Sequence, residues 1–265
     1  MDETELPGRV PGPDDAGFPA HHAPRAAGIA ALDDLVIQCR ACPRLVAWRE
    51  EVAVVKRAAF REWDYWGRPV PGFGPADASV AVVGLAPAAH GGNRTGRMFT
   101  GDATGDFLFA ALHEVGLASQ PASVHAGDGL VLRGVRLTSP VHCAPPANKP
   151  TPRERDTCRA WLIRELILLS PGLRAIVVLG AFGWQALLPA LAESGRTLPR
   201  PRPVFGHGAH VVLPATEQGH ELHLLGSYHA SQRNTFTGRL TMPMLTDVLR
   251  EAAVLGGIGP AGPGG

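Results

Sequence analysis

The chain has 265 residues, 45% of them apolar, and its 25 basic and 24 acidic side chains leave a net charge of +1. This length and apolar content suit one large hydrophobic core, in one catalytic domain with tails. The most apolar stretch, residues 175–192, is interrupted by Gly180, Gly183 and Pro189. A buried strand followed by a helix therefore explains it better than a membrane span does.

The first thirty residues are polar and interrupted by prolines, with five acidic side chains against Arg9 and Arg25. We predict a disordered tail over residues 1–30, a catalytic domain over residues 31–255 and a second disordered tail over residues 256–265. The first tail lacks the apolar segment of a secretory signal, so a cytoplasmic protein is expected. Residues 31–265 hold 23 basic and 19 acidic side chains, a net charge of +4 that permits nucleic-acid binding.

Strands alternate with helices along the predicted domain. A short helix is expected to begin at Asp33 and Asp34, and residues 61–75 form an aromatic-rich loop packed on the core. Further helices are predicted at 44–56, 104–115, 153–169, 182–191 and 242–253, strands at 78–83, 175–179, 210–213 and 222–225, and a hairpin that feeds an inner strand at 130–141. This order predicts a three-layer α/β fold around a parallel sheet.

Residues 84–102, GLAPAAHGGNRTGRMFTGD, join the first of these strands to the following helix. Ligands bind at the carboxyl ends of strands in open α/β sheets, so we interpret this glycine-rich loop as one wall of an active site. It has neither the ending of a phosphate-binding P-loop nor G-x-G-x-x-G spacing, which disfavours nucleotide hydrolysis and nicotinamide binding. A second polar loop, residues 226–241, follows the last strand, and the two loops could face each other across a cleft.

The chain has four cysteines, Cys39, Cys42, Cys143 and Cys158, and the first two form a C-x-x-C pair. A cytosolic chain does not usually keep disulfides, so this set favours a structural metal site. Tetrahedral sulfur ligation suits zinc or an iron–sulfur cluster, and the spacing does not choose between them. The alternative is four buried thiols that only pack.

Together, the loop at 84–102, the segment CAPPANKPTP at 143–152, the HASQRN loop at 229–234 and the four cysteines resemble the uracil-DNA glycosylase superfamily, family 5 or type B. The resemblance covers residues 35–252. It implies a four-stranded parallel sheet between helices and a 4Fe–4S cluster on the four cysteines. It also implies removal of uracil, and often of other bases such as hypoxanthine, xanthine or ethenocytosine, from DNA, leaving an abasic site.

The resemblance also assigns roles to individual residues. Phe99 matches the aromatic residue that stacks on the extruded base, and His229 matches the histidine that donates a hydrogen bond to the developing base anion. Asn93 matches a polar residue near the sugar that could orient water. Asp102 is expected either to assist electrostatically or to cap the following helix. The remaining expected contacts are Gly84, Ala86, Ser139 and Asn234 to the substrate, and Arg94, Arg97, Arg233 and Arg239 to the DNA.

The sequence departs from the wider superfamily in two places. Ala86 stands where classical uracil-DNA glycosylases have a water-activating aspartate, so the general base is unassigned and charge stabilisation should carry catalysis. Ser139 stands where relatives often have an asparagine that reads the base edge. A hydroxyl makes fewer directional contacts than an amide, so loose discrimination between bases is expected.

Two other functions were weighed. A DNA-binding protein could keep the fold and metal site and only recognise lesions. A hydrolase using Ser231 and His229 is disfavoured because no acidic residue in that loop orients the histidine and no G-x-S-x-G elbow is present. The expected partner is damaged DNA, with no membrane, and the expected state is a monomer.

Overall fold

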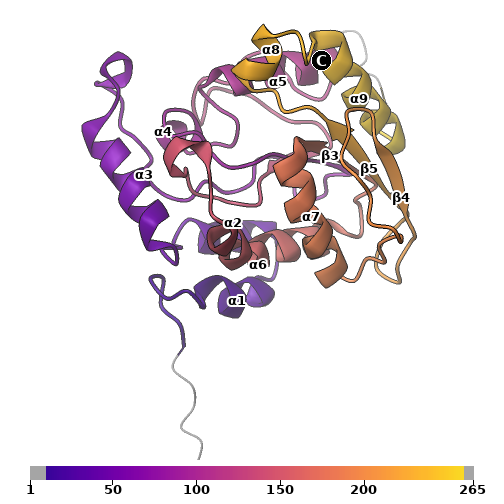
Figure 1. Ribbon diagram of the computed structural model, residues 1–265, viewed down its shortest axis with the longest axis horizontal. Coiled ribbons are helices and arrows are strands. Elements are labelled where there is room, and N and C mark those ends of the chain that lie inside the picture. The colour runs from indigo at the N-terminus through magenta and orange to yellow at the C-terminus, as the bar shows by residue number, and fades with distance from the viewer. Residues whose placement is uncertain (1–9, 260–265) are drawn as a thin grey trace, which may run out of the picture.

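The computed structural model describes residues 10–259, and a sheet in the order β2-β1-β3-β5-β4 forms its centre (Figure 1). Val80 of β1 lies opposite Val135 of β2 and Ala175 of β3. The strands are β1 (Val80–Val83), β2 (Val135–Thr138), β3 (Ala175–Leu179), β4 (His210–Leu213) and β5 (Leu222–Ser227), of which only β4 is antiparallel to its neighbour. The predicted α/β fold is confirmed. The resemblance implied four strands, and the sheet has a fifth, because the strand predicted at 210–213 joins one edge antiparallel as β4.

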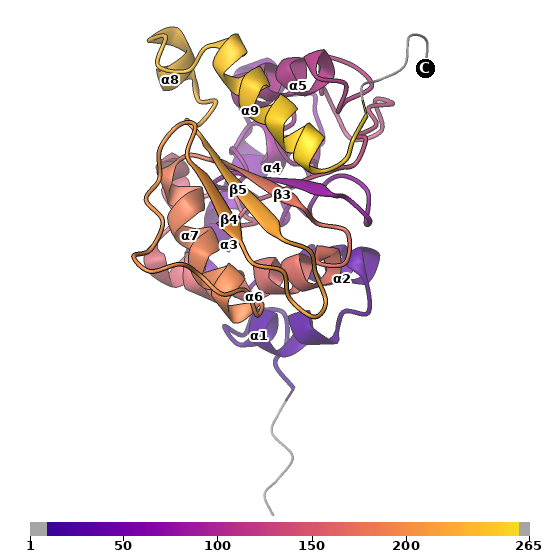
Figure 2. The ribbon, with the colours of Figure 1, turned by 90° about the vertical axis from the view of Figure 1, so that its right-hand side faces the viewer.

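Helices cover both faces of the sheet (Figure 2). Successive side chains of a strand point to opposite faces, so Val80 and Val82 pack against α5 (Ala103–Glu114) and α9 (Met242–Leu255). Ala81 and Val83 pack against the other layer, α6 (Pro152–Leu169) and α7 (Ala181–Glu193). The result is the expected three-layer arrangement.

Side-chain caps determine where the long helices begin. Thr151 accepts a hydrogen bond from the Glu154 amide, and the Glu154 carboxylate accepts one from the Thr151 amide, which completes a capping box at α6. Asp102 and Thr241 cap α5 and α9 by accepting hydrogen bonds from backbone amides, without the reciprocal bond. The helix start expected near Thr151 is therefore confirmed.

The N-terminal part of the chain departs from the predicted disordered tail. Helix α1 (Phe18–His22), a 3₁₀ turn (Ala23–Arg25) and α2 (Ile29–Val36) pack on α6. The Phe18 ring lies 5.9 Å from that of Trp161, so a few apolar side chains suffice to order this segment. Residues 1–9 of the predicted tail lie outside the described residues.

The structure also differs from two smaller predictions. The hairpin expected at 130–141 does not form, because Leu132 bridges Ala118 and only the second half of the segment enters the sheet. The expected C-terminal tail is ordered as far as Ile258, which packs on the core, and residues 260–265 lie outside the described part. No helix within residues 10–259 combines the length and apolarity that a bilayer crossing requires.

The remaining helices lie in loops or at the side of the domain. Helix α3 (Pro43–Val55) stands away from the sheet beside α4 (Gly92–Thr95), and α8 (Gln232–Phe236) lies in the second polar loop (Figure 1). Short 3₁₀ turns occur at Ala58–Phe60 and Pro146–Asn148.

Candidate active site

A cavity of about 330 Å³ opens where β1, β2 and β5 end, within the size range of small-molecule sites. Both polar loops contribute to it, as the sequence predicted. Its lining residues are Leu85, Ala86, Pro87, Ala88, Met98, Phe99, Asp102, Thr104, Ser139, Asn148, His229 and Ser231. Five predicted site residues, namely Ala86, Phe99, Asp102, Ser139 and His229, are therefore brought together.

Two glycines hold Phe99 against the end of β1. A Cβ atom at Gly84 would lie 2.4 Å from the Phe99 ring, and one at Gly105 would lie 1.7 Å from its carbonyl oxygen. Phe99 itself has a left-handed backbone, φ 55°, which is uncommon for a bulky residue. Gly84 thus acts by admitting the ring, which presents an aromatic surface to the cavity.

His229 follows β5 and is held from two sides. Gly180 has φ 93°, and a Cβ there would lie 3.2 Å from the Cβ of His229. Asn234 of α8 donates a hydrogen bond from Nδ2 to the His229 carbonyl at 2.8 Å. Asn234, predicted to contact substrate, is therefore not among the cavity-lining residues and acts through the backbone of His229. Burial lowers the pKa of His229, which favours the neutral imidazole.

Asp102 caps the following helix, as one of the two predictions had it, and it also lines the cavity, where the electrostatic role stays a prediction. Its Oδ1 accepts hydrogen bonds from the amides of Thr104 and Gly105, at 2.9 and 3.0 Å, which caps α5. The same carboxyl group lines the cavity. Burial raises its pKa, with the two amide hydrogen bonds acting in the opposite direction.

Asn93 and Arg94 are not where the sequence analysis expected them. Asn93 is fully buried, and its Nδ2 donates to the Arg49 carbonyl at 3.1 Å, away from the cavity. Arg94 is 4% exposed and lies between the rings of Phe60 and Trp63, with 3.9 and 4.1 Å from its guanidinium carbon to their centroids. Neither residue contacts the cavity, and Arg94 is too enclosed to bind DNA.

Arg97, also predicted to bind DNA, is buried in an ion pair. Its guanidinium donates two hydrogen bonds to the Asp128 carboxylate, at 2.8 and 2.6 Å. Burial alone would raise the pKa of Asp128, but the hydrogen bonds from Arg97 and from backbone amides hold that pKa below its usual value. The pair connects the active-site loop to the segment before β2.

We expect Asp128→Asn to lower the free energy of unfolding by about 3–5 kcal/mol, because it leaves the buried guanidinium without its counter-ion. Since the pKa of Asp128 is depressed in the folded state, the contribution of Asp128 to the free energy of unfolding is present at neutral pH. That contribution is lost as the pH falls through the folded-state pKa. Urea denaturation at neutral and acidic pH checks both points. Asp247→Asn, in an exposed pair with Arg250, is the control and should change stability by less than about 0.5 kcal/mol.

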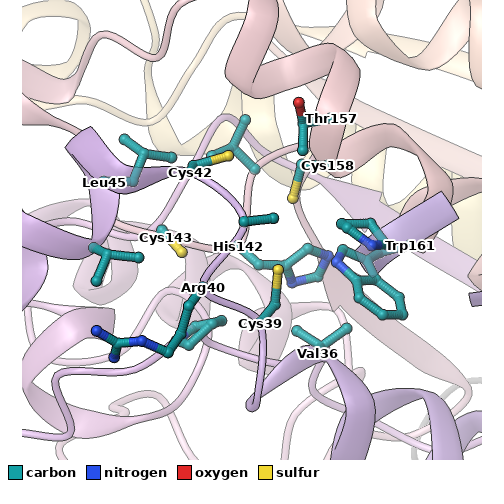
Figure 3. A pocket seen from close by; sticks show the side chains of 15 residues that line it. Val36, Cys39, Arg40, Cys42, Leu45, His142, Cys143, Thr157, Cys158 and Trp161 are labelled. Carbon is teal, nitrogen blue, oxygen red and sulfur yellow. The ribbon is translucent and has the colours of Figure 1, made fainter. Parts of the chain in front are cut away.

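The four cysteines surround one small cavity at the side of the domain (Figure 3). Cys39 and Cys42 come from the connection between α2 and α3, Cys143 follows β2, and Cys158 lies on α6. Figure 3 shows the four sulfur atoms turned toward a common space. Burial raises the pKa of Cys143 to about 11 and, together with the neighbouring thiols, that of Cys42 to about 12. Among residues 10–259, no three His, Cys, Asp or Glu side chains are arranged to hold a metal ion.

Comparison with known proteins supports the resemblance. Residues 71–253 match the family model of the uracil DNA glycosylase superfamily. The chain belongs to this superfamily. It is 57% identical over 233 residues to a type-5 uracil-DNA glycosylase of Mycobacterium bovis, covering 88% of this chain and 84% of the relative. Type-5 enzymes of Thermus thermophilus and Pyrobaculum aerophilum are 54% and 46% identical, over 83% and 88% of the chain and 94% and 95% of the relatives.

In this superfamily member the other two arginines that were predicted to contact DNA, Arg233 and Arg239, are exposed on the loop that carries His229. Arg233 lies on α8, and Arg239 lies over the ring of Tyr228, the neighbour of His229, at 4.5 Å from its centroid. Their predicted contact with DNA stays a prediction.

The sequence analysis missed Met98 and Asn148 as lining residues. Asn148 has φ 55° and follows Ala147, with φ 53°, in the 3₁₀ turn before α6. Asparagine tolerates this conformation better than most residues. The Ala-Asn pair between prolines was therefore the sequence signal from which this turn could have been predicted. The turn brings an amide side chain to the cavity that Ser139 also lines.

Proposed function

We propose that the chain hydrolyses the N-glycosidic bond of deoxyuridine in DNA, releasing uracil and leaving an abasic site, as a first step of base excision repair. The observation that supports this most directly is that Phe99, Asp102 and His229 line one cavity. The relatives named above are uracil-DNA glycosylases. We further propose that the protein acts as a cytoplasmic monomer.

The lining residues suit a dissociative reaction on an extruded nucleotide. A base inside duplex DNA is out of reach, so the nucleotide rotates into the cavity, where the Phe99 ring can stack on the base. As the bond from C1′ to the base breaks, its electron pair moves to the base and the sugar becomes cationic. Neutral His229 donates a hydrogen bond to the developing base anion, and the Asp102 carboxylate stabilises the sugar cation. Water then bonds to C1′ and releases a proton.

We expect Asp102→Asn to lower kcat about 10- to 100-fold, because it removes the negative charge beside the sugar. Asparagine is an equally good helix cap, so the free energy of unfolding should not fall. The pKa of Asp102 is raised by burial, so wild-type activity should decline as the pH drops through that raised value, and the variant should lack this acidic limb. Asp106→Asn, one turn along α5 and outside the cavity, is the control.

Ser139 supports a broader range of bases. Its Oγ donates a hydrogen bond to the Val141 carbonyl at 2.9 Å, so the hydroxyl proton is engaged and the group offers a base edge only acceptor lone pairs, fewer contacts than an amide would make. Hypoxanthine and ethenocytosine are therefore proposed as further substrates. Release of uracil alone from oligonucleotides that carry one lesion each would contradict this extension.

We also propose that the four cysteines hold a 4Fe–4S cluster. One zinc ion would draw four sulfurs to within about 4 Å of each other, whereas a cluster accepts one thiolate at each of four irons. Arg49 suits such an anionic group: it is 2% exposed, and its Nη1 donates to Cys143 Sγ at 2.9 Å. Its nearest carboxylate, from Glu50, lies 3.9 Å away. A buried guanidinium needs a counter-charge, which thiolates would supply. When bound, the cluster would cross-link the N-terminal helices to α6.

The test is base release from oligonucleotides with a single uracil, hypoxanthine or ethenocytosine, using anaerobically purified protein whose visible spectrum is recorded first. Free base released by a brown protein is the expected result. Binding to lesions without any release would contradict the glycosylase and favour a lesion-binding protein, and a colourless active protein would contradict the cluster.

A further inference from the structure

A basic segment, residues 56–68, follows α3 and stands beside the active-site loop. The end of α3 and the chain after it project from the body of the domain on the side of α4 (Figure 1). The segment carries four basic side chains, Lys56, Arg57, Arg61 and Arg68, and two acidic ones, Glu62 and Asp64, a net charge of +2. We name it the basic arm.

Arg94 fastens the basic arm to the wall of the cavity. Its guanidinium lies between the rings of Phe60 and Trp63, both in the arm. The same guanidinium donates to the carbonyls of His90 and Gly101, at 2.7 and 2.8 Å. Gly101 lies between the cavity residues Phe99 and Asp102, so this contact fixes the arm one residue away from the site.

A second contact joins the same two segments. The Tyr65 hydroxyl of the arm hydrogen-bonds His90 Nδ1 at 3.1 Å. Burial lowers the pKa of His90, and the charges of Arg57 and Arg94 lower it further. The Arg57 guanidinium therefore lies close enough to the active-site loop to act on it electrostatically.

The exposed arginines of the arm have no protein counter-ion. Arg57, Arg61 and Arg68 are exposed, and within the described part of the chain none of them forms an ion pair. Other exposed arginines differ among themselves: Arg44 pairs with Glu154 at 2.7 Å, whereas Arg153 and Arg202 form no ion pair within the described residues. The arm differs from these in holding three such cations in one segment that is fastened to the cavity wall. A rigid segment with unpaired cations beside the cavity matches a ligand that presents a row of negative charges.

We propose that the basic arm binds the phosphate backbone of the DNA that flanks the extruded nucleotide. This inference rests on the proposed function, because DNA that delivers one nucleotide to the cavity continues past its opening on both sides. Duplex DNA carries one negative charge for about every 1.7 Å of its axis. Phosphate contacts of this kind set the position of the duplex and carry no sequence information.

The test compares the double variant Arg57→Gln/Arg61→Gln with the wild type in binding an undamaged duplex of about 20 base pairs, between about 50 and 200 mM salt. We expect about tenfold weaker binding by the double variant, and a slope of log K against log salt that is smaller by about 2. Uracil release from a trinucleotide, which carries few flanking phosphates, should change much less than duplex binding. Arg174→Gln is the control, because Arg174 precedes β3 and so lies at the amino ends of the strands, away from the cavity at their carboxyl ends.

The outcomes separate this inference from the proposed function. Equal affinity and equal salt slope for the double variant and the wild type would overturn the arm as a DNA contact, whatever the catalytic result. A wild type that binds duplex through the arm and releases no base would overturn only the glycosylase. A double variant that also loses activity on the trinucleotide would show that the arm shapes the cavity instead of binding DNA.

Discussion

Replacing His229 with alanine is expected to lower kcat for uracil release about 10²–10³-fold, the loss typical of one donor to a developing anion. His229 lines the cavity, and burial lowers its pKa, so the imidazole is neutral at pH 7 and donates without carrying a charge. Because the donor acts on charge that appears only in the transition state, KM and the affinity for uracil-containing duplex should stay near their wild-type values. Single-turnover kinetics and a binding titration measure the two quantities separately.

His113→Ala is the matched control, since His113 is an exposed histidine on α5 outside the cavity, and it should retain full activity. A His229→Ala variant with unchanged kcat would remove His229 from the mechanism. The pH profile adds a further check. With a lowered pKa, the neutral form of His229 persists below pH 6.5, so the wild-type pH profile should show no step at the ordinary histidine pKa of 6.5.

Replacing Cys158 with alanine is expected to abolish retention of the proposed cluster and to lower Tm by 10 °C or more, equivalent to about 5 kcal/mol. Cys158 is buried on α6 and faces the space that the other three thiols surround (Figure 3). If the thiol only packed, its removal would leave a small cavity and cost about 1–2 kcal/mol. Iron and sulfide content, with thermal unfolding of the same samples, distinguishes the two cases.

Thr157→Ala controls for the change in packing, because Thr157 lines the same cavity from the same helix and offers no thiolate. It should keep wild-type iron content and lose little stability. Two results together would show that the four cysteines only pack. The wild-type protein would contain neither iron nor zinc after anaerobic purification, and the Cys158→Ala variant would unfold within a few degrees of the wild type.

Local signals in the sequence were enough to predict the sheet and much of the cavity. Valine-rich runs predicted β1 and β3, and the helix predicted at 153–169 begins within one residue of α6. The topology predicted that the two loops meet at one edge of the sheet, and the family resemblance singled out Phe99 and His229 within them. These features depend on short-range pattern and on the topology that the pattern implies.

The residues whose positions were predicted wrongly are placed by tertiary contacts that the local sequence does not reveal. An irregular loop leaves backbone carbonyls that need donors, and Arg94 satisfies those of His90 and Gly101 from inside the protein. A polar residue in a loop next to an active site therefore looks the same in sequence whether it faces ligand or backbone. The N-terminal helices posed a related problem: Phe18 is buried only because Trp161, far along the chain, lies opposite it.

The cysteine cavity joins parts of the chain that are distant in sequence. Cys42 and Cys143 are about a hundred residues apart, and the described strand β1 and helix α5 lie between them. A group bonded to all four thiolates would keep this loop closed in the unfolded chain as well, which in the chain-entropy model favours the folded state by about 5 kcal/mol. Refolding of a cluster-loaded chain would then start with the loop between Cys42 and Cys143 already closed. In the cluster-free chain these two segments must first meet by diffusion.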